Sequence, residues 1–99
     1  MKEDLKILIL DNNSLKRLPN EICELKNLTN LSVSSNELEE LPELIGNLEN
    51  LQELDVEDNK LESIPDTINN LINLKNLFID NNKGLKKPQS LELEFCDVK

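Results

Sequence analysis

Apolar residues recur along the chain at a constant interval. Blocks of 23 residues open at Leu5, Leu28, Leu51 and Leu74, and the first, fourth and sixth positions of each block are apolar. The first three blocks also continue alike, with RLPNEICEL, ELPELIGNL and SIPDTINNL. An interval that never drifts predicts stacked copies of one supersecondary unit instead of a globule with a central cleft.

The fourth and sixth positions of each block lie two residues apart, so in an extended strand their side chains point to the same side. The pattern therefore predicts one short strand per block, with this side facing the interior. The inward pairs are Leu8 and Leu10, Leu31 and Val33, Leu54 and Val56, and Leu77 and Ile79.

The ninth position of every block is an asparagine, where the chain leaves the predicted strand. A short side-chain amide can hydrogen-bond N–H and C=O groups of neighbouring coils that would otherwise be buried unpaired. We expect these residues to form a ladder with a structural role. They are Asn13, Asn36, Asn59 and Asn82.

Prolines recur at the same interval, at Pro19, Pro42, Pro65 and Pro88. The fixed φ of proline suits the entry into the second half of a block, where a backbone N–H is not needed. After each of the first three prolines, an isoleucine and a leucine stand three residues apart, which suits a turn or two of α-helix or 3₁₀ helix. We therefore expect a structural role for the prolines.

Together the blocks follow the pattern L-x-x-L-x-L-x-x-N-x-L-x-x-L-P-x-x-I-x-x-L over residues 5–91. This pattern resembles the leucine-rich repeat family in its 23-residue, proline-containing form. The resemblance implies an α/β fold: a right-handed solenoid of about four coils, with a parallel β-sheet on the concave face and short helical or 3₁₀ segments on the convex face. We expect a single domain, 1–99, with repeats at 5–27, 28–50, 51–73 and 74–96.

The fourth block departs from the pattern, because Gly84 stands where an inward leucine belongs and Leu85 comes one place late. We predict a degenerate final repeat, with residues 89–99 as a C-terminal cap. Apolar residues alternate in this tail and indicate a short strand over the open end, at Leu91, Leu93 and Phe95.

Acidic residues outnumber basic residues by 20 to 11, which gives a formal net charge of −9. Such a chain repels phosphate backbones and anionic lipids, so we expect neither nucleic acid nor membrane as a partner. Acidic residues near the start, and an apolar run too short for a signal peptide or a membrane span, predict a cytoplasmic protein. Cys23 and Cys96 lie about three repeats apart, beyond disulfide reach, and we predict that both are reduced.

The residue types needed for catalysis are missing or badly placed. Histidine is absent, neither cysteine has a general base beside it, and there is no glycine-rich phosphate loop. The carboxylates fall at exposed strand positions and not in an apolar pocket that could raise one pKa. The stretch 80–84, DNNKG, lacks the spaced ligands of a calcium loop. We predict no enzymatic activity, no cofactor and no metal site.

The outward side of the predicted strands is the informative surface, because residues at one repeat position stack into a row about 4.8 Å apart. The third, fifth, seventh and eighth positions together place an acidic centre between exposed apolar groups. The candidate partner-binding residues are Ile7, Ile9, Asp11, Asn30, Ser32, Glu53, Asp55, Glu57, Asp58, Asn76, Phe78 and Asp80.

We hypothesise that this face binds a protein segment carrying Lys or Arg beside an apolar anchor. The family resemblance implies a regulatory or scaffolding context, with small GTPases or phosphatases as partners, or an effector-like role. Three alternatives stay open. The face could be merely solvated, the uncapped first strand could form a homo-oligomer, or the chain could be part of a longer repeat protein without activity of its own.

Overall fold

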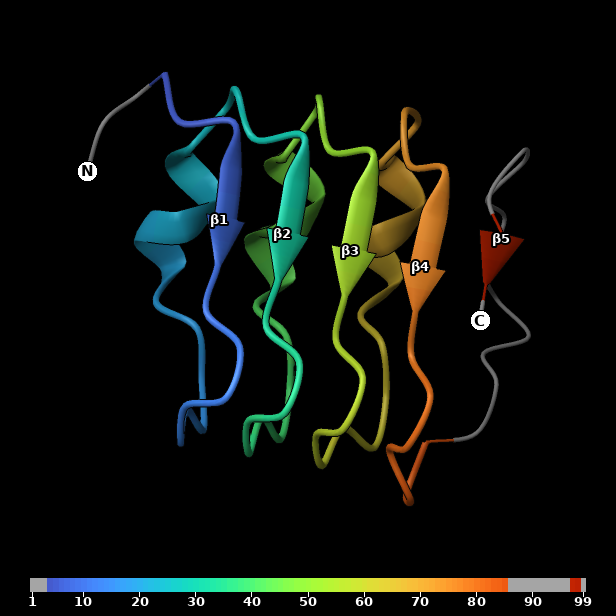
Figure 1. The fold of residues 1–99 in the computed structure, drawn as a ribbon. Coiled ribbons are helices and arrows are strands. Elements are labelled where there is room, and N and C mark those ends of the chain that lie inside the picture. The colour runs from blue at the N-terminus through green and yellow to red at the C-terminus, as the bar shows by residue number, and fades with distance from the viewer. Residues whose placement is uncertain (1–3, 86–96, 99) are drawn as a thin grey trace.

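The computed structural model describes residues 4–85 and 97–98. The expectations for Pro88, Cys96 and the alternating tail residues 91–95 lie outside the described residues, as does most of the cap expected at 89–99. The strands form one sheet in which each strand pairs in parallel with the next along the chain (Figure 1). They are β1 (Ile7–Ile9), β2 (Asn30–Ser32), β3 (Glu53–Asp55), β4 (Asn76–Phe78) and β5 (Asp97–Val98).

Short 3₁₀ helices lie on the side of the molecule opposite the sheet (Figure 1). They are η1 (Asn20–Glu24), η2 (Glu43–Asn47) and η3 (Asp66–Asn70). A proline precedes each one in extended geometry, with φ of −66° at Pro19, −65° at Pro42 and −64° at Pro65. Each proline carbonyl accepts a backbone N–H from the isoleucine three residues on, so the helix turns tightly at once. The predicted right-handed solenoid, with its parallel sheet and short helical segments, is confirmed.

Aliphatic side chains fill the space between sheet and helices. Leu31, Leu54 and Leu77 occupy the same position in successive coils and are at most 1% exposed. The equivalent residue of the first coil, Leu8, is only half-buried, as is Leu10. The difference arises because, in the part of the chain that the structure describes, no coil packs against the outer side of β1.

The ninth-position asparagines satisfy the backbone between coils. The Oδ1 atom of Asn59 accepts the N–H of Leu38 at 3.0 Å, and its Nδ2 atom donates to the carbonyls of Val33 and Val56, each at 3.0 Å. One side chain thus links two coils in the interior, where unpaired amides are costly. The same arrangement occurs at Asn36 and Asn82. Asn13 differs, because it is exposed and its amide donates within its own coil.

A second asparagine ladder runs along the opposite edge of the solenoid. The Nδ2 atom of Asn50 donates to the carbonyl of Lys26 at 2.9 Å, and that of Asn73 donates to the carbonyl of Glu49 at 2.8 Å. These asparagines hold the last position of their blocks. Their 23-residue spacing is visible in the sequence, but no role was predicted for them.

The eighth position of every coil adopts the left-handed backbone region. The φ angles are 60° at Asn12, 56° at Ser35, 56° at Asp58 and 60° at Asn81. Short polar residues tolerate this region better than others, and asparagine and aspartate tolerate it best. Asp58 was predicted only as a partner-binding residue, but it also allows the left-handed backbone conformation of this turn.

The last described strand continues the sheet. In β5, Asp97 pairs with Asn76 and Val98 pairs with Leu77, both in parallel. A tail strand was expected at residues 91–95, which lie outside the described residues, so the strand that the structure describes lies further along the chain.

Candidate functional site

Two rows of residues with outward-facing side chains cross the strands of the sheet. Strand register sets their membership, and neighbouring members lie about 4.8 Å apart. The third-position row is Ile7, Asn30, Glu53 and Asn76, and the fifth-position row is Ile9, Ser32, Asp55 and Phe78.

A depression of about 340 Å³ opens between these rows, and we call it the sheet-face depression. All of its lining residues except Leu31 are candidates from the sequence. The remaining candidates, Asp11, Glu57, Asp58, Asn76 and Asp80, are not among its lining. The lining residues are Ile7, Ile9, Asn30, Leu31, Ser32, Glu53, Asp55 and Phe78.

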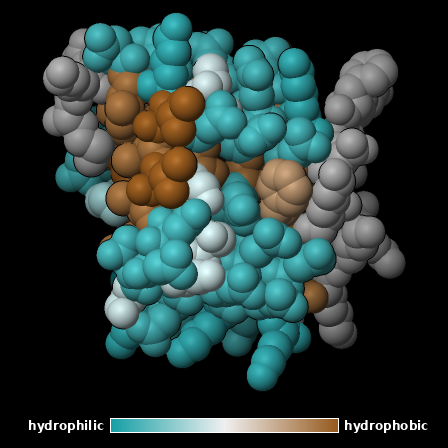
Figure 2. Space-filling view, in the orientation of Figure 1, coloured by the Kyte–Doolittle hydropathy of each residue, from teal (hydrophilic) through white to brown (hydrophobic). Residues whose placement is uncertain are grey.

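The depression has an apolar wall at each end. Ile7 and Ile9 of β1 are 57% and 65% exposed, which is unusual for isoleucine. Phe78 of β4 is half-buried at the other end. Figure 2 shows hydrophobic surface over β1 and a smaller patch over β4, with mostly hydrophilic surface between them.

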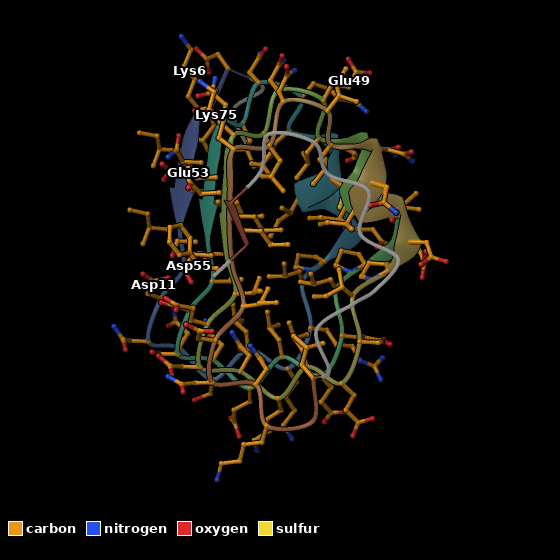
Figure 3. All side chains as sticks on the ribbon, turned by 90° about the vertical axis from the view of Figure 1, so that its right-hand side faces the viewer. Lys6, Asp11, Glu49, Glu53, Asp55 and Lys75 are labelled. Atoms are coloured by element: carbon orange, nitrogen blue, oxygen red, sulfur yellow. The ribbon has the colours of Figure 1, made fainter. Side chains whose placement is uncertain are left out.

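Carboxylates lie between the two walls. Figure 3 shows Glu53 and Asp55 on the outer side of the sheet, with Lys6 and Lys75 near the N-terminal ends of β1 and β4. An oxygen of Glu53 accepts the Asn30 amide at 3.1 Å, which orients the carboxylate without neutralising it. Among the described residues, no Lys or Arg lies within ion-pair distance of either carboxylate.

The carboxylates in the depression and just after the C-terminal ends of the strands repel one another. Partial burial raises the pKa of Asp55, the backbone N–H of Glu57 lowers it, and the charges of Asp11 and Asp58 raise it. The pKa of Glu57 is raised by desolvation and then by Asp55, Asp80 and Asp58. Nearby negative charges disfavour the ionised form, so a cation placed here would be bound favourably.

Asp11 has a structural role in addition to the partner-binding role predicted for it. Its Oδ1 atom accepts the hydroxyl of Ser32 at 2.7 Å and the backbone N–H of Ser34 at 2.9 Å. The carboxylate therefore links the first coil to the second. This role was not predicted, because a periodic pattern alone does not show which hydroxyl or backbone groups of neighbouring coils come into contact.

The other candidates outside the depression border it. Asn76 is half-buried beside Glu53 in the third-position row. The backbone N–H of Asp58 donates to the carbonyl of Asp80 at 3.0 Å, beyond the C-terminal ends of β3 and β4. Glu57 is half-buried immediately before Asp58. The charge of Asp58 raises the pKa of Asp55 in the depression, whereas Asn76 is uncharged.

A larger hollow of about 540 Å³ lies between the first two coils, away from the sheet face. It is lined by the prolines that precede η1 and η2 and by Arg17 and Glu40, whose charges are opposite, so it lacks the unbalanced charge of the sheet-face depression. Within residues 4–85 and 97–98, no group of three or more His, Cys, Asp or Glu side chains is arranged to hold a metal ion. Nor does the described part of the chain contain a helix with the length and apolar character needed to cross a bilayer.

Comparisons with known proteins identify the family of this chain. A family model for the leucine-rich repeat matches residues 3–61 and 26–83. A leucine-rich repeat protein of Leptospira interrogans is 40% identical with a TM-score of 0.88, over 97% of this chain and 25% of that one. Internalin F of Listeria monocytogenes is 25% identical with a TM-score of 0.76, over 95% of this chain and 27% of that one.

Internalin C2 of the same organism is 24% identical with a TM-score of 0.75, over 97% of this chain and 40% of that one, and shows the fold alone. No curated protein matches the sequence. This chain therefore spans between a quarter and two fifths of the length of these solved relatives.

Proposed function

The chain belongs to the leucine-rich repeat family, and we propose that its sheet-face depression binds a protein segment through basic and apolar side chains of that partner. Leucine-rich repeat proteins generally mediate protein–protein interactions. The role proposed here is that of a regulatory or scaffolding module without catalytic activity of its own.

One observation carries this proposal: Glu53 and Asp55 lie between two apolar walls with no described cation to balance them. Ile7 and Ile9 would lose water-exposed apolar surface on binding, which is worth about 25 cal/mol per Å². Charge complementarity would guide the partner and reject acidic competitors. A segment that carries both an apolar and a basic side chain can contact the apolar walls and the carboxylates of the depression together.

The proposal is tested by panning a random peptide library, displayed on phage, against the full chain. We expect the retained peptides to be enriched in Lys or Arg next to Leu, Ile, Val or Phe. The same panning against a Glu53→Gln/Asp55→Asn double variant, which neutralises both carboxylates of the depression, should lose the enrichment in basic residues. Asparagine at position 55 keeps an oxygen that can accept the N–H of Glu57, so the local backbone is preserved.

A Glu49→Gln variant is the matched control, because Figure 3 places Glu49 away from the sheet face and it is exposed. It should select the same peptides as the wild type. Retention of acidic or purely apolar peptides, or the same basic enrichment with the double variant, would show that the proposal is wrong.

Self-association through β1 is a second candidate, because Leu8 and Leu10 are half-buried and β1 is an edge strand of the sheet that the described residues form. Unpaired edge strands readily pair with another chain. Light scattering over a range of protein concentrations tests it. A mass that stays at that of one chain, 11.3 kDa, would rule it out.

A further inference from the structure

The two apolar walls of the depression lie in one row of the sheet. Ile9 pairs with Ser32, Ser32 with Asp55, and Asp55 with Phe78, so three interstrand steps separate the two apolar residues. At about 4.8 Å per step, the distance across the row is about 14 Å. Asp55 lies two thirds of the way along it.

An extended chain laid along this row matches that distance. Alternate side chains of a strand point the same way and are about 6.6 Å apart, so residues i and i+4 span about 13 Å. In an α-helix, which rises 1.5 Å per residue, same-face residues at i+7 and i+11 lie about 10.5 and 16.5 Å away. The helical spacings therefore fall about 4 Å short of the far wall or about 2 Å beyond it, whereas the extended spacing differs from it by about 1 Å.

The residue at i+2 of an extended segment faces the same surface. It would lie about 6.6 Å from the Ile9 end, between Ser32 and Asp55. A lysine or arginine there can direct its charged end toward both Asp55 and Glu53, which project from the same side of β3. The polar middle of the row thus suits a basic side chain. An apolar side chain there would cover the carboxylates without pairing their charges, which is unfavourable.

We infer that the partner segment is extended, runs across the strands of the sheet, and carries the pattern apolar–x–basic–x–apolar. This inference rests on the proposed function and specifies which segment occupies the site. The segment lies on the face of the sheet and not along its edge, so its specificity comes from the three side chains and not from backbone pairing.

Fluorescence anisotropy with defined labelled peptides tests the inference on the full chain. The matched peptide has nine residues, with lysine at the centre, leucine two residues to each side, and serine or glycine elsewhere. A permuted peptide of the same composition has the leucines next to the lysine. We expect the permuted peptide to bind at least about tenfold more weakly, because both leucines face away from the sheet when the lysine between them faces it.

Two variants separate the parts of the pattern. Ile9→Ser should remove the preference for the matched spacing while binding still depends on the lysine. Glu53→Gln/Asp55→Asn should remove the dependence on the lysine while the spacing preference remains. Ile72→Ser is the matched control, because Ile72 is 83% exposed and lies outside the depression, and it should behave as the wild type. Circular dichroism verifies that each variant is folded.

The outcomes distinguish this inference from the proposed function. Equal binding of matched and permuted peptides, with lysine and Asp55 still required, would overturn the pattern and leave the function standing. Tighter binding of a helical peptide with leucines at i, i+7 and i+11 would do the same. If binding of every peptide is insensitive to lysine and to the Glu53→Gln/Asp55→Asn double variant, both are wrong.

Discussion

The carboxylate of Asp55 accepts the backbone N–H of Glu57 at 3.0 Å, although the two side chains carry like charges. The hydrogen bond favours ionised Asp55, whereas partial burial and the neighbouring carboxylates oppose it. The balance raises the pKa of both groups above their ordinary values of 3.8 and 4.5. The acidic centre therefore costs stability when it is charged and has no partner.

The pH dependence of stability should reveal this cost. A carboxyl whose folded pKa is raised binds more protons folded than unfolded, so its contribution is favourable below the unfolded value and is lost as the pH rises through the folded value. The Asp55→Asn/Glu57→Gln variant should therefore be more stable than the wild type at neutral pH. This gain should shrink on acidification through the folded pKa values and vanish below 3.8, the ordinary value of Asp55.

Urea unfolding at a series of pH values measures this difference, with Glu49→Gln as the reference for removing an exposed carboxylate elsewhere. A gain that is the same at every pH would show that the two groups do not titrate as described.

Replacement of Asn59 by alanine should strongly destabilise the fold. The change leaves the N–H of Leu38 and the carbonyls of Val33 and Val56 without their partner in the interior. At about 1–3 kcal/mol for each unsatisfied group, the free energy of unfolding should fall by at least about 3 kcal/mol. Asn13→Ala is the matched control at the exposed end of the same ladder, and urea unfolding should show a loss below about 1 kcal/mol. Equal losses at the two sites would contradict the ladder's role.

A β-branched residue at Ser35 should destabilise the turn that follows β2. Its φ of 56° lies in the left-handed region, where a side chain branched at Cβ costs about 1–2 kcal/mol. Ser35→Val should therefore lower the thermal midpoint, whereas Ser35→Asn, the residue type at this position in the first and fourth coils, should not. Ser63→Val tests valine at an exposed serine without positive φ and should change stability by about 0.5 kcal/mol or less.

Substitution of Gly46 by alanine should destabilise the protein, although replacing a helical glycine by alanine usually increases stability. An added Cβ would lie 2.5 Å from the carbonyl oxygen of Thr67, so η2 and η3 would have to move apart. We expect a loss of about 1–3 kcal/mol, measured by urea unfolding. At Gly84 the nearest atom is the Glu62 Cγ at 3.1 Å, on a flexible side chain, and Gly84→Ala should be close to neutral. A neutral Gly46→Ala would show that the coils are not packed this closely.

The chain's periodic pattern was enough to predict the coils, the strand register and the inward leucines. The reason is physical: each coil packs mainly on the coils 23 residues before and after it, so a regular pattern and a regular stack imply each other. The rows through Asn30 and Asp55 follow from the same period, and they were predicted with the correct members.

Only the tertiary structure decided which hydrogen bonds the individual outward side chains make. Asp11 is held by Ser32 and Ser34, while Asp55 turns back to its own coil, although both are aspartates at outward positions. Which of these occurs depends on individual atoms coming within about 3 Å, in the adjacent coil for Asp11 and in the same coil for Asp55, a condition far finer than the spacing of residues in a pattern. The period therefore determines where side chains are displayed, and tertiary contacts determine which of them remain available to a partner.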